Sequence, residues 1–390
     1  MILLSRQGAG MNFMSLLNMV DSEYYMFCDQ DDVWFPDKIE KSLSRMREEE
    51  GKHGKEIPII VHTDRTHVNA DLTLAICMYN ASPYIEETLK SVIAQSMQDF
   101  HLLIVDDCST DDSVQAVRAF FDSNFRQYEL ICLEQNQGIA HARHFAEHHA
   151  ATRYLLFVDA DDILHPQLVE KEYQAIRSDA DLMGVSCWLE FISENGKSLS
   201  GGHYLGVPEK EQFLNRAKRN KLVFLPICTM YNREAALRTG GFSIDGYPDG
   251  FPRYRDFCED LEHWTRMSDL YVEGKAIITL PETLYWYRKR GGLSSNSFNM
   301  IIKMRYVKQN LLRRRAGDEE LSFIEFMDSL SDKELAALKR DAAAADALRN
   351  AHYYWKKRQL LKVAVEVLKS VWYRPGYIID KLKHNSGINK

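Results

Sequence analysis

The chain has 390 residues, of which 45% are hydrophobic and 27% are charged, and its net charge is −7. These values are typical of a soluble globular protein with room for one large domain or two smaller ones. The acidic balance argues against nucleic acid as the main partner. The seven cysteines stand singly, without a CxxC pair, as expected for reduced core residues in a cytosolic protein.

The N-terminal sequence MILLSRQGAG lacks the charged start and long apolar run of a signal peptide. No stretch of 18 or more apolar residues follows it, so the sequence predicts no membrane-spanning helix. We therefore expect a cytoplasmic protein.

An aspartate-rich segment is the first element along the chain, and it occurs twice. FCDQDDVWFPDKIEK at 27–41 and FVDADDILHPQLVEK at 157–171 share one plan at a constant offset of 130 residues. A repeat of this length indicates a duplicated domain rather than a solenoid of short repeats. Because the first copy begins so near the start of the chain, we interpret residues 1–66 as a truncated half module.

From residue 71 onward, short apolar runs alternate with helical patterns. Strands are predicted for LTLAICM (72–78), FHLLIV (100–105), YELICL (128–133) and YLLFV (154–158), all of them buried. Helical spacing fills the three intervals between them. Such alternation predicts an α/β fold with a mostly parallel central sheet and helices on both faces.

Acidic residues follow two of these strands, where ligands of parallel sheets bind. Asp106 and Asp107 follow the second strand, although an Asp-Asp pair can also cap a helix. Asp159 and Asp161 follow the fourth and are two residues apart, so both carboxylates can face one point. Hard carboxylate oxygens of this kind favour Mg²⁺ or Mn²⁺ held jointly with phosphate oxygens.

Three stretches, LAICMYNASPYIEETLKSVIAQSMQDFHLLIVDDCSTDDS, NQGIAHARH and FVDADDILHP, together resemble the inverting family 2 glycosyltransferases of the GT-A fold. The resemblance covers about residues 71–292, which would form the catalytic domain. It implies a nucleotide-sugar donor, a glycan or lipid-linked acceptor, and a role in bacterial cell-surface polysaccharide biosynthesis.

The resemblance also implies roles for individual residues. Contacts to the base, the ribose and the diphosphate are implied for Cys77, Tyr79, Asp106, Asp107, Asp159 and Asp162. Asp159 and Asp161 would be the DxD pair that binds the metal, with Asp161 the direct ligand. Arg288, in the closing segment WYRKRGGLSSNS, would cover the diphosphate.

A helix is predicted over RDFCEDLEHWTRMSDL (255–270), and its first turn carries Glu259 and Asp260. Acids at this position can simply complement the helix dipole. The resemblance instead matches the pair to the Glu-Asp motif of the family and makes Asp260 the general base, with Glu259 beside it.

Residues 296–390 read as a helical region whose last forty residues are strongly basic. An apolar stripe from Leu360 to Val371 makes the final helix amphipathic. Such a helix can lie on an anionic membrane surface or pack on its own catalytic domain, and the sequence favours neither.

Two other functions stay open at this stage. A phosphohydrolase of the haloacid-dehalogenase type also places a DxD motif after a buried strand, although Asp162-Ile163 is not its usual continuation. A catalytically degenerate binding protein with a transferase fold would account for the half module.

Overall fold

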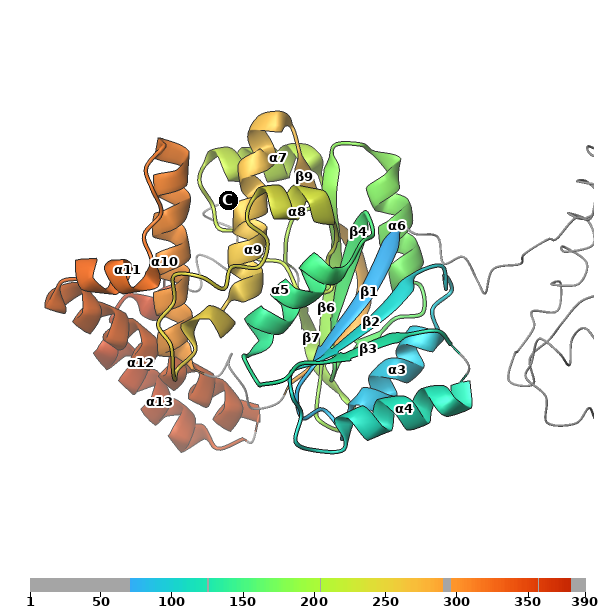
Figure 1. Cartoon of the computed structure of the whole chain (residues 1–390). Coiled ribbons are helices and arrows are strands. Elements are labelled where there is room, and N and C mark those ends of the chain that lie inside the picture. Colours follow the sequence, from blue (N-terminus) through green and yellow to red (C-terminus); the bar gives the residue numbers. More distant parts are fainter. Residues whose placement is uncertain (1–70, 125, 204, 290–295, 357, 380–390) are drawn as a thin grey trace, which may run out of the picture. The chain divides into compact units, whose positions relative to one another are not determined.

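The computed structural model describes residues 71–379 except 125, 204, 290–295 and 357. The half module predicted for 1–66, with its aspartate cluster, lies outside the described residues. Within the described part, the predicted class is confirmed: an α/β fold with a central sheet, followed by a helical C-terminal region (Figure 1).

Four parallel strands form the first half of the sheet, in the order β3-β2-β1-β4. They are β1 (Leu72–Met78), β2 (His101–Asp106), β3 (Glu129–Cys132) and β4 (Tyr154–Asp159). All seven residues of β1 are buried, as expected for a strand covered on both faces. The prediction that β3 is buried is wrong, because β3 is an edge strand that pairs only with β2 and stays partly exposed.

The connecting helices are α3 (Ile85–Ile93), α4 (Ser113–Asn124) and α5 (Ile139–His149) (Figure 1). The chain moves from β1 outward to β3 and then returns to β4 on the other side of β1. Because parallel crossovers are right-handed, this reversal places α5 on the opposite face from α3 and α4. The reversal also creates a switch point between β1 and β4, where such sheets bind ligands.

Five further strands extend the sheet beyond β4. They are β5 (Ile163–Leu164), β6 (Leu182–Ile192), β7 (Ser198–His203), β8 (Met230–Asn232) and β9 (Ala276–Arg288). Strand order continues β4-β8-β6-β9-β5, with β7 on β6, and only β6 and β9 run parallel to each other. The antiparallel pairing of β5 with β9 sets Ile163 opposite Trp286, so the end of β9 lies beside the DxD turn.

The helices of this half are α6 (Leu168–Ser178), α7 (Lys210–Lys218), α8 (Arg233–Arg238) and α9 (Glu259–Met267), and short 3-10 turns, η1 (Tyr254–Asp256) and η2 (Ser268–Glu273), flank α9. The predicted helix at 255–270 therefore exists, but its regular α-helical part is shorter.

The C-terminal region consists of α10 (Ser297–Ala316), α11 (Phe323–Ser329), α12 (Asp332–Lys356) and α13 (Leu360–Tyr373). A second hydrophobic cluster, separate from the core of the sheet, packs α10 and α11 against α9 through Leu261, Ile302, Tyr306, Phe323 and Phe326. The C-terminal region thus supports the helix that carries Glu259 and Asp260.

Candidate active site

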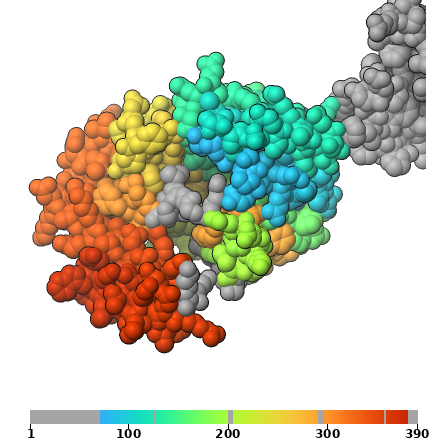
Figure 2. All heavy atoms as spheres, turned by 90° about the horizontal axis from the view of Figure 1, so that it is seen from below, coloured from blue at the N-terminus to red at the C-terminus, as the bar shows by residue number. Residues whose placement is uncertain are grey.

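A cavity of about 850 Å³ opens at the carboxyl ends of the parallel strands. Figure 2 shows the molecule hollowed on the side where these strands end. Of the residues singled out in the sequence, the lining contains Cys77, Tyr79, Asp107, Asp159, Asp161, Glu259, Asp260 and Arg288. The fold therefore brings residues up to 211 positions apart to one cavity.

The loop after β3 is tied to the end of β2 by the carboxylate of Asp107. This carboxylate accepts hydrogen bonds from the backbone N–H groups of Gln137 (2.9 Å) and Gly138 (2.8 Å) and from the side-chain amide of Asn136 (2.8 Å). Burial raises the pKa of Asp107 despite the two backbone donors. Gly138 has φ +96°, and an added Cβ would lie 2.1 Å from an oxygen of Asp256, so only glycine fits this turn.

The end of β1 presents two different side chains to the cavity. Cys77 is buried, and burial raises the pKa of its thiol to about 12, so it is neutral near neutral pH. Tyr79, just beyond the strand, is 46% exposed and offers an aromatic face at the wall of the cavity.

Asp106 and Asp162 do not line the cavity, although the resemblance implies nucleotide contacts for both. Both are buried. The carboxylate of Asp106 accepts from the backbone (2.9 Å) and hydroxyl (2.5 Å) of Ser109, and that of Asp162 accepts from the backbone N–H of Arg288 (2.7 Å). Burial and the neighbouring Asp159 and Asp161 raise the pKa of Asp162 well above its usual range. Both residues therefore hold loops behind the cavity wall.

The DxD pair lies at the end of β4 and in the turn that follows. Asp159 accepts a hydrogen bond from the guanidinium of Arg143 at 2.6 Å, and its backbone N–H donates to the hydroxyl of Tyr285 at 3.2 Å. Residues 71–379, apart from the undescribed gaps, contain no group of three or more His, Cys, Asp or Glu side chains placed to hold a metal. Two carboxylates completed by phosphate oxygens are, however, a usual donor set for Mg²⁺.

Arg288 is nearly fully buried, and its guanidinium has several partners. It donates to the carbonyl oxygens of Asp161 (2.6 Å) and Glu194 (2.7 Å) and to the carboxylate of Glu87 (2.5 Å). These bonds fix the backbone of the DxD turn. Lys289, the next residue, also lines the cavity.

Glu259 and Asp260 occupy the first turn of α9, which follows Cys258 in a left-handed conformation (φ +53°). Burial raises the pKa of both carboxyl groups, and that of Glu259 reaches about 8. Arg143 opposes the shift in both cases. A carboxylate whose pKa is raised toward neutrality accepts a proton better than an ordinary surface aspartate.

Arg143, on α5, forms ion pairs with two of these acids at once. Its guanidinium bonds Asp159 at the end of β4 and Glu259 on α9, and its side chain is only 5% exposed. Burial alone would lower the pKa of Arg143, but the two carboxylates raise it, so the arginine stays charged. One cation thus links the DxD pair to the Glu-Asp pair.

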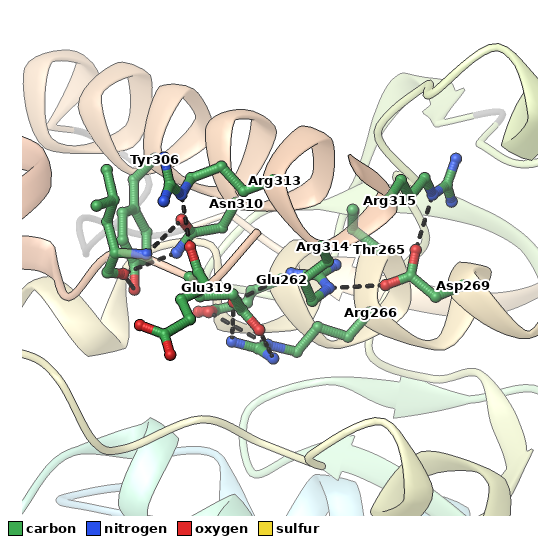
Figure 3. A network of polar contacts seen from close by, with 12 residues as sticks. Glu262, Thr265, Arg266, Asp269, Tyr306, Asn310, Arg313, Arg314, Arg315 and Glu319 are labelled. Carbon is green, nitrogen blue, oxygen red and sulfur yellow. Dashed lines mark hydrogen bonds and ion pairs between the residues drawn. The ribbon is translucent and has the colours of Figure 1, made fainter. Parts of the chain in front are cut away.

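Charged contacts fasten α9 and η2 to the C-terminal region (Figure 3). Arg266 forms an ion pair with Glu320 (2.7 Å), and Asp269 accepts from both Arg314 (2.7 Å) and Arg315 (2.8 Å). These pairs lie on the far end of α9 from Asp260 and therefore fix its direction.

The family model described as Glycosyl transferase family 2 matches residues 73–239. Residues 73–239 are therefore similar to family 2 glycosyltransferase domains. The matched residues include the whole parallel half of the sheet and the DxD turn, but they end before α9.

Among curated proteins, the chain is 27% identical over 263 residues to the "Putative teichuronic acid biosynthesis glycosyltransferase TuaG" of Bacillus subtilis. The aligned residues cover 66% of this chain and 94% of the relative. It is 41% identical over 93 residues to the "Teichoic acid poly(glycerol phosphate) polymerase" of Staphylococcus epidermidis. These residues make up 24% of this chain and 13% of that protein. Among solved structures, S. aureus TarS 1-349 in complex with UDP-GlcNAc has a TM-score of 0.47 and 19% identity, over 78% of this chain and 92% of that one.

Sequence reasoning gave no role to Arg143, although NQGIAHARH contains it. An arginine on an otherwise ordinary helix carries no signal of its partners, which come from β4 and α9. It also missed Lys289, which directly follows β9, and Asp256, which lies in the turn η1; both line the cavity only because the second half of the chain folds against the first.

Proposed function

We propose that this glycosyltransferase transfers a sugar from a nucleotide-sugar donor to a glycan or lipid-linked acceptor, with inversion at the anomeric carbon. The observation that supports this most is the meeting of the DxD pair and Asp260 at one cavity, where Arg143 pairs with Asp159 and with Glu259, the neighbour of Asp260. Displacement with inversion needs a base for the acceptor and a cationic environment for the leaving diphosphate, at two neighbouring places.

In the proposed reaction, the carboxylate of Asp260 takes the proton of an acceptor hydroxyl. The acceptor oxygen then bonds to the anomeric carbon while the bond from that carbon to the diphosphate oxygen breaks, and the nucleoside diphosphate leaves. Support for Asp260 comes from its place in the cavity wall and from its raised pKa. Glu259, paired with Arg143, would keep the first turn of α9 in place.

A divalent cation, Mg²⁺ or Mn²⁺, fits the two carboxylates of Asp159 and Asp161 together with diphosphate oxygens. When bound, it would neutralise negative charge on the leaving group. We assign Asp161, which lines the cavity and which the resemblance makes the metal ligand, as the direct ligand.

Donor binding is proposed for the end of the cavity formed by β1 and β2. Tyr79 and Cys77 would contact the base and ribose, and Asp107 would hold the loop at Gly138 around them. Arg288 would act by fixing the DxD turn, since its guanidinium already bonds that turn. Asp106 and Asp162 would support these loops from behind.

We further propose a role in cell-surface polysaccharide biosynthesis on the cytoplasmic side of the membrane. Support comes from the names of the two relatives, which refer to teichuronic and teichoic acid. The basic C-terminal sequence also suggests contact with the membrane surface. That contact would be made by α13 and not by the residues of the cavity.

The decisive experiment is a screen of UDP-, GDP- and dTDP-sugars for thermal stabilisation, with Mg²⁺, with Mn²⁺ and with EDTA. A donor at 100 times its dissociation constant stabilises the folded chain by about 2.7 kcal/mol. We expect one nucleotide class to stabilise the protein only with metal. Asp161→Ala should remove this stabilisation, and Asp318→Ala, which changes an exposed aspartate, should keep it.

Turnover with the donor found in this way separates the remaining functions. Transfer to an acceptor with an inverted anomeric proton signal by NMR supports the proposal, and retention would refute inversion. Phosphate release from simple phosphoesters without an acceptor would point to a phosphohydrolase, and donor binding without turnover would point to a degenerate binding protein.

A further inference from the structure

Helix α13 packs on α12 through a side that mixes polar and apolar residues, with Val363 and Val367 half-buried on it, and leaves a larger apolar side exposed. Its buried residues are Glu366 and Ser370, and the hydroxyl of Ser370 donates to the carbonyl oxygen of Ala344 on α12 at 3.0 Å. The opposite side, called here the α13 surface, consists of Leu360, Leu361, Val365, Leu368, Val371 and Trp372, all exposed. Leu361 and Trp372 are 86% and 85% exposed.

The α13 surface is a single continuous face. Its members follow the spacing i, i+1, i+4, i+5, i+8, i+11 and i+12 when Ala364 is included, which is the periodicity of one side of a helix. A soluble helix normally turns such a face toward the core. A contiguous exposed apolar face of this kind marks an interaction site.

The composition of α12 explains why this face is not used inside the protein. The side chains that α12 buries include Ala342, Ala344, Ala347 and Ala351. At Ala344 the two helices meet through the short side chain of Ser370, and the large apolar side chains of α13 lie on its other side.

Charge decides what covers the α13 surface. Residues 358–379 contain four cations, Arg358, Lys362, Lys369 and Arg374, and one acid, Glu366. Glu366 is buried and paired with Lys369 at 2.6 Å, and Arg374 pairs with Asp341 of α12 at 3.2 Å, so Arg358 and Lys362 carry the excess positive charge of this segment. Two copies meeting through this face would bring their cations together without an opposing acid from the helix. An anionic lipid surface supplies the opposite charge and an apolar layer together.

We propose that the α13 surface binds the face of an anionic lipid bilayer. The helix has 14 residues, or about 21 Å of rise, against a hydrocarbon core about 30 Å thick, so it would lie along the surface. No helix in the described part of the chain is both long enough and apolar enough to cross a membrane. Trp372, an amphipathic aromatic residue, suits the headgroup level.

The position of α13 agrees with a membrane-bound acceptor. Figure 2 shows the C-terminal helices, in red, on the same side of the molecule as the hollow. If the chain is a glycosyltransferase as proposed, membrane binding through α13 would bring the active-site cavity near lipid-linked acceptors. The binding itself needs no catalytic activity and is tested without it.

The test is flotation of the full chain with vesicles of phosphatidylcholine alone and of phosphatidylcholine with phosphatidylglycerol. We expect binding to the anionic vesicles and its loss at high salt, because the attraction to lipid is partly electrostatic. Leu361→Ser/Leu368→Ser/Trp372→Ser should lower the partition coefficient by about 100-fold or more, since each change removes a large apolar side chain from lipid. Lys362→Gln/Lys369→Gln should weaken binding to anionic vesicles only.

Val272→Ser/Ile324→Ser is the matched control, since these exposed apolar side chains lie on η2 and α11, and it should bind like the unchanged chain. Circular dichroism and thermal unfolding show whether the variants fold, and sedimentation velocity gives their oligomeric state. Absence of binding to anionic vesicles at low salt would overturn the proposal. A dimer without vesicle binding that the triple variant dissociates would assign the face to a second copy instead.

Discussion

Replacing Lys303 by methionine should destabilise the fold in a pH-dependent way. Lys303, on α10, is fully buried, and its ammonium lies 2.7 Å from the carboxylate of Glu262 on α9 and 4.0 Å from the ring centroid of Tyr247. Methionine keeps much of the volume but removes the charge. The carboxylate of Glu262 then keeps the hydroxyl of Tyr247 (2.7 Å) and the guanidinium of Arg266 (3.6 Å) as partners.

Removing one partner of a buried ion pair typically costs 3–5 kcal/mol. Because Tyr247 and Arg266 remain, we expect the lower end, about 3 kcal/mol, at pH 8. Burial alone would raise the pKa of Glu262, but Lys303 and Arg266 hold it below its usual value of 4.5. The stability from this pair is therefore present above pH 4.5 and is lost as the pH falls through the folded pKa.

In Lys303→Met the pKa of Glu262 rises, so the carboxyl group becomes protonated at a higher pH and the penalty shrinks as the pH falls. Urea denaturation at pH 8 and pH 5 measures this, with Lys339→Met on the exposed side of α12 as control. Lys303→Met/Glu262→Gln should recover at least half of the loss. A loss under about 1 kcal/mol, or one that is equal at both pH values and not recovered in the double variant, would refute the reasoning.

Three further expectations concern the base, a buried acid and the half module. Asp260→Asn should lower the transfer rate roughly 10²-fold and remove the decline in activity at acidic pH, while donor affinity stays unchanged; reduced affinity at an unchanged maximal rate would assign Asp260 to binding. Burial raises the pKa of Glu172 well above 4.5, so folded stability falls as the pH rises above that value, by up to about 1.4 kcal/mol per unit. The free energy of unfolding of Glu172→Gln should therefore rise relative to that of the unchanged chain between pH 5 and pH 8 in urea denaturation. A difference in unfolding free energy that stays constant over this range would contradict this. Asp29→Ala/Asp31→Ala should leave transfer intact, and loss of activity in a folded variant would show that the two aspartate clusters cooperate.

Local sequence determines much of the first half of this molecule. The parallel strands and the helices between them depend on apolar runs and helical periodicity, which are properties of neighbouring residues. Because parallel strands present their carboxyl ends at one edge, the same patterns predict where Tyr79, Asp107 and Asp159 gather. All three line the cavity.

Only the tertiary structure decides which side chains in that region face the cavity. Asp106 and Asp107 are adjacent in sequence, yet only Asp107 lines the cavity, because each carboxylate is oriented by hydrogen bonds from different loops. The sequence around Arg288 suggests a solvent-exposed cation. In the structure, β9 places its guanidinium where it donates a hydrogen bond to the carbonyl oxygen of Asp161 in the DxD turn. Its role depends on strand pairing between segments more than 120 residues apart.

The final helix shows the same division. The sequence alone establishes that α13 is amphipathic and basic, since both properties follow from residue spacing and composition. It does not determine which side faces the protein, because that depends on the partner helix. On α12 the carbonyl oxygen of Ala344 accepts from Ser370, which fixes the packed side of α13 and leaves the side with Leu361 and Trp372 exposed.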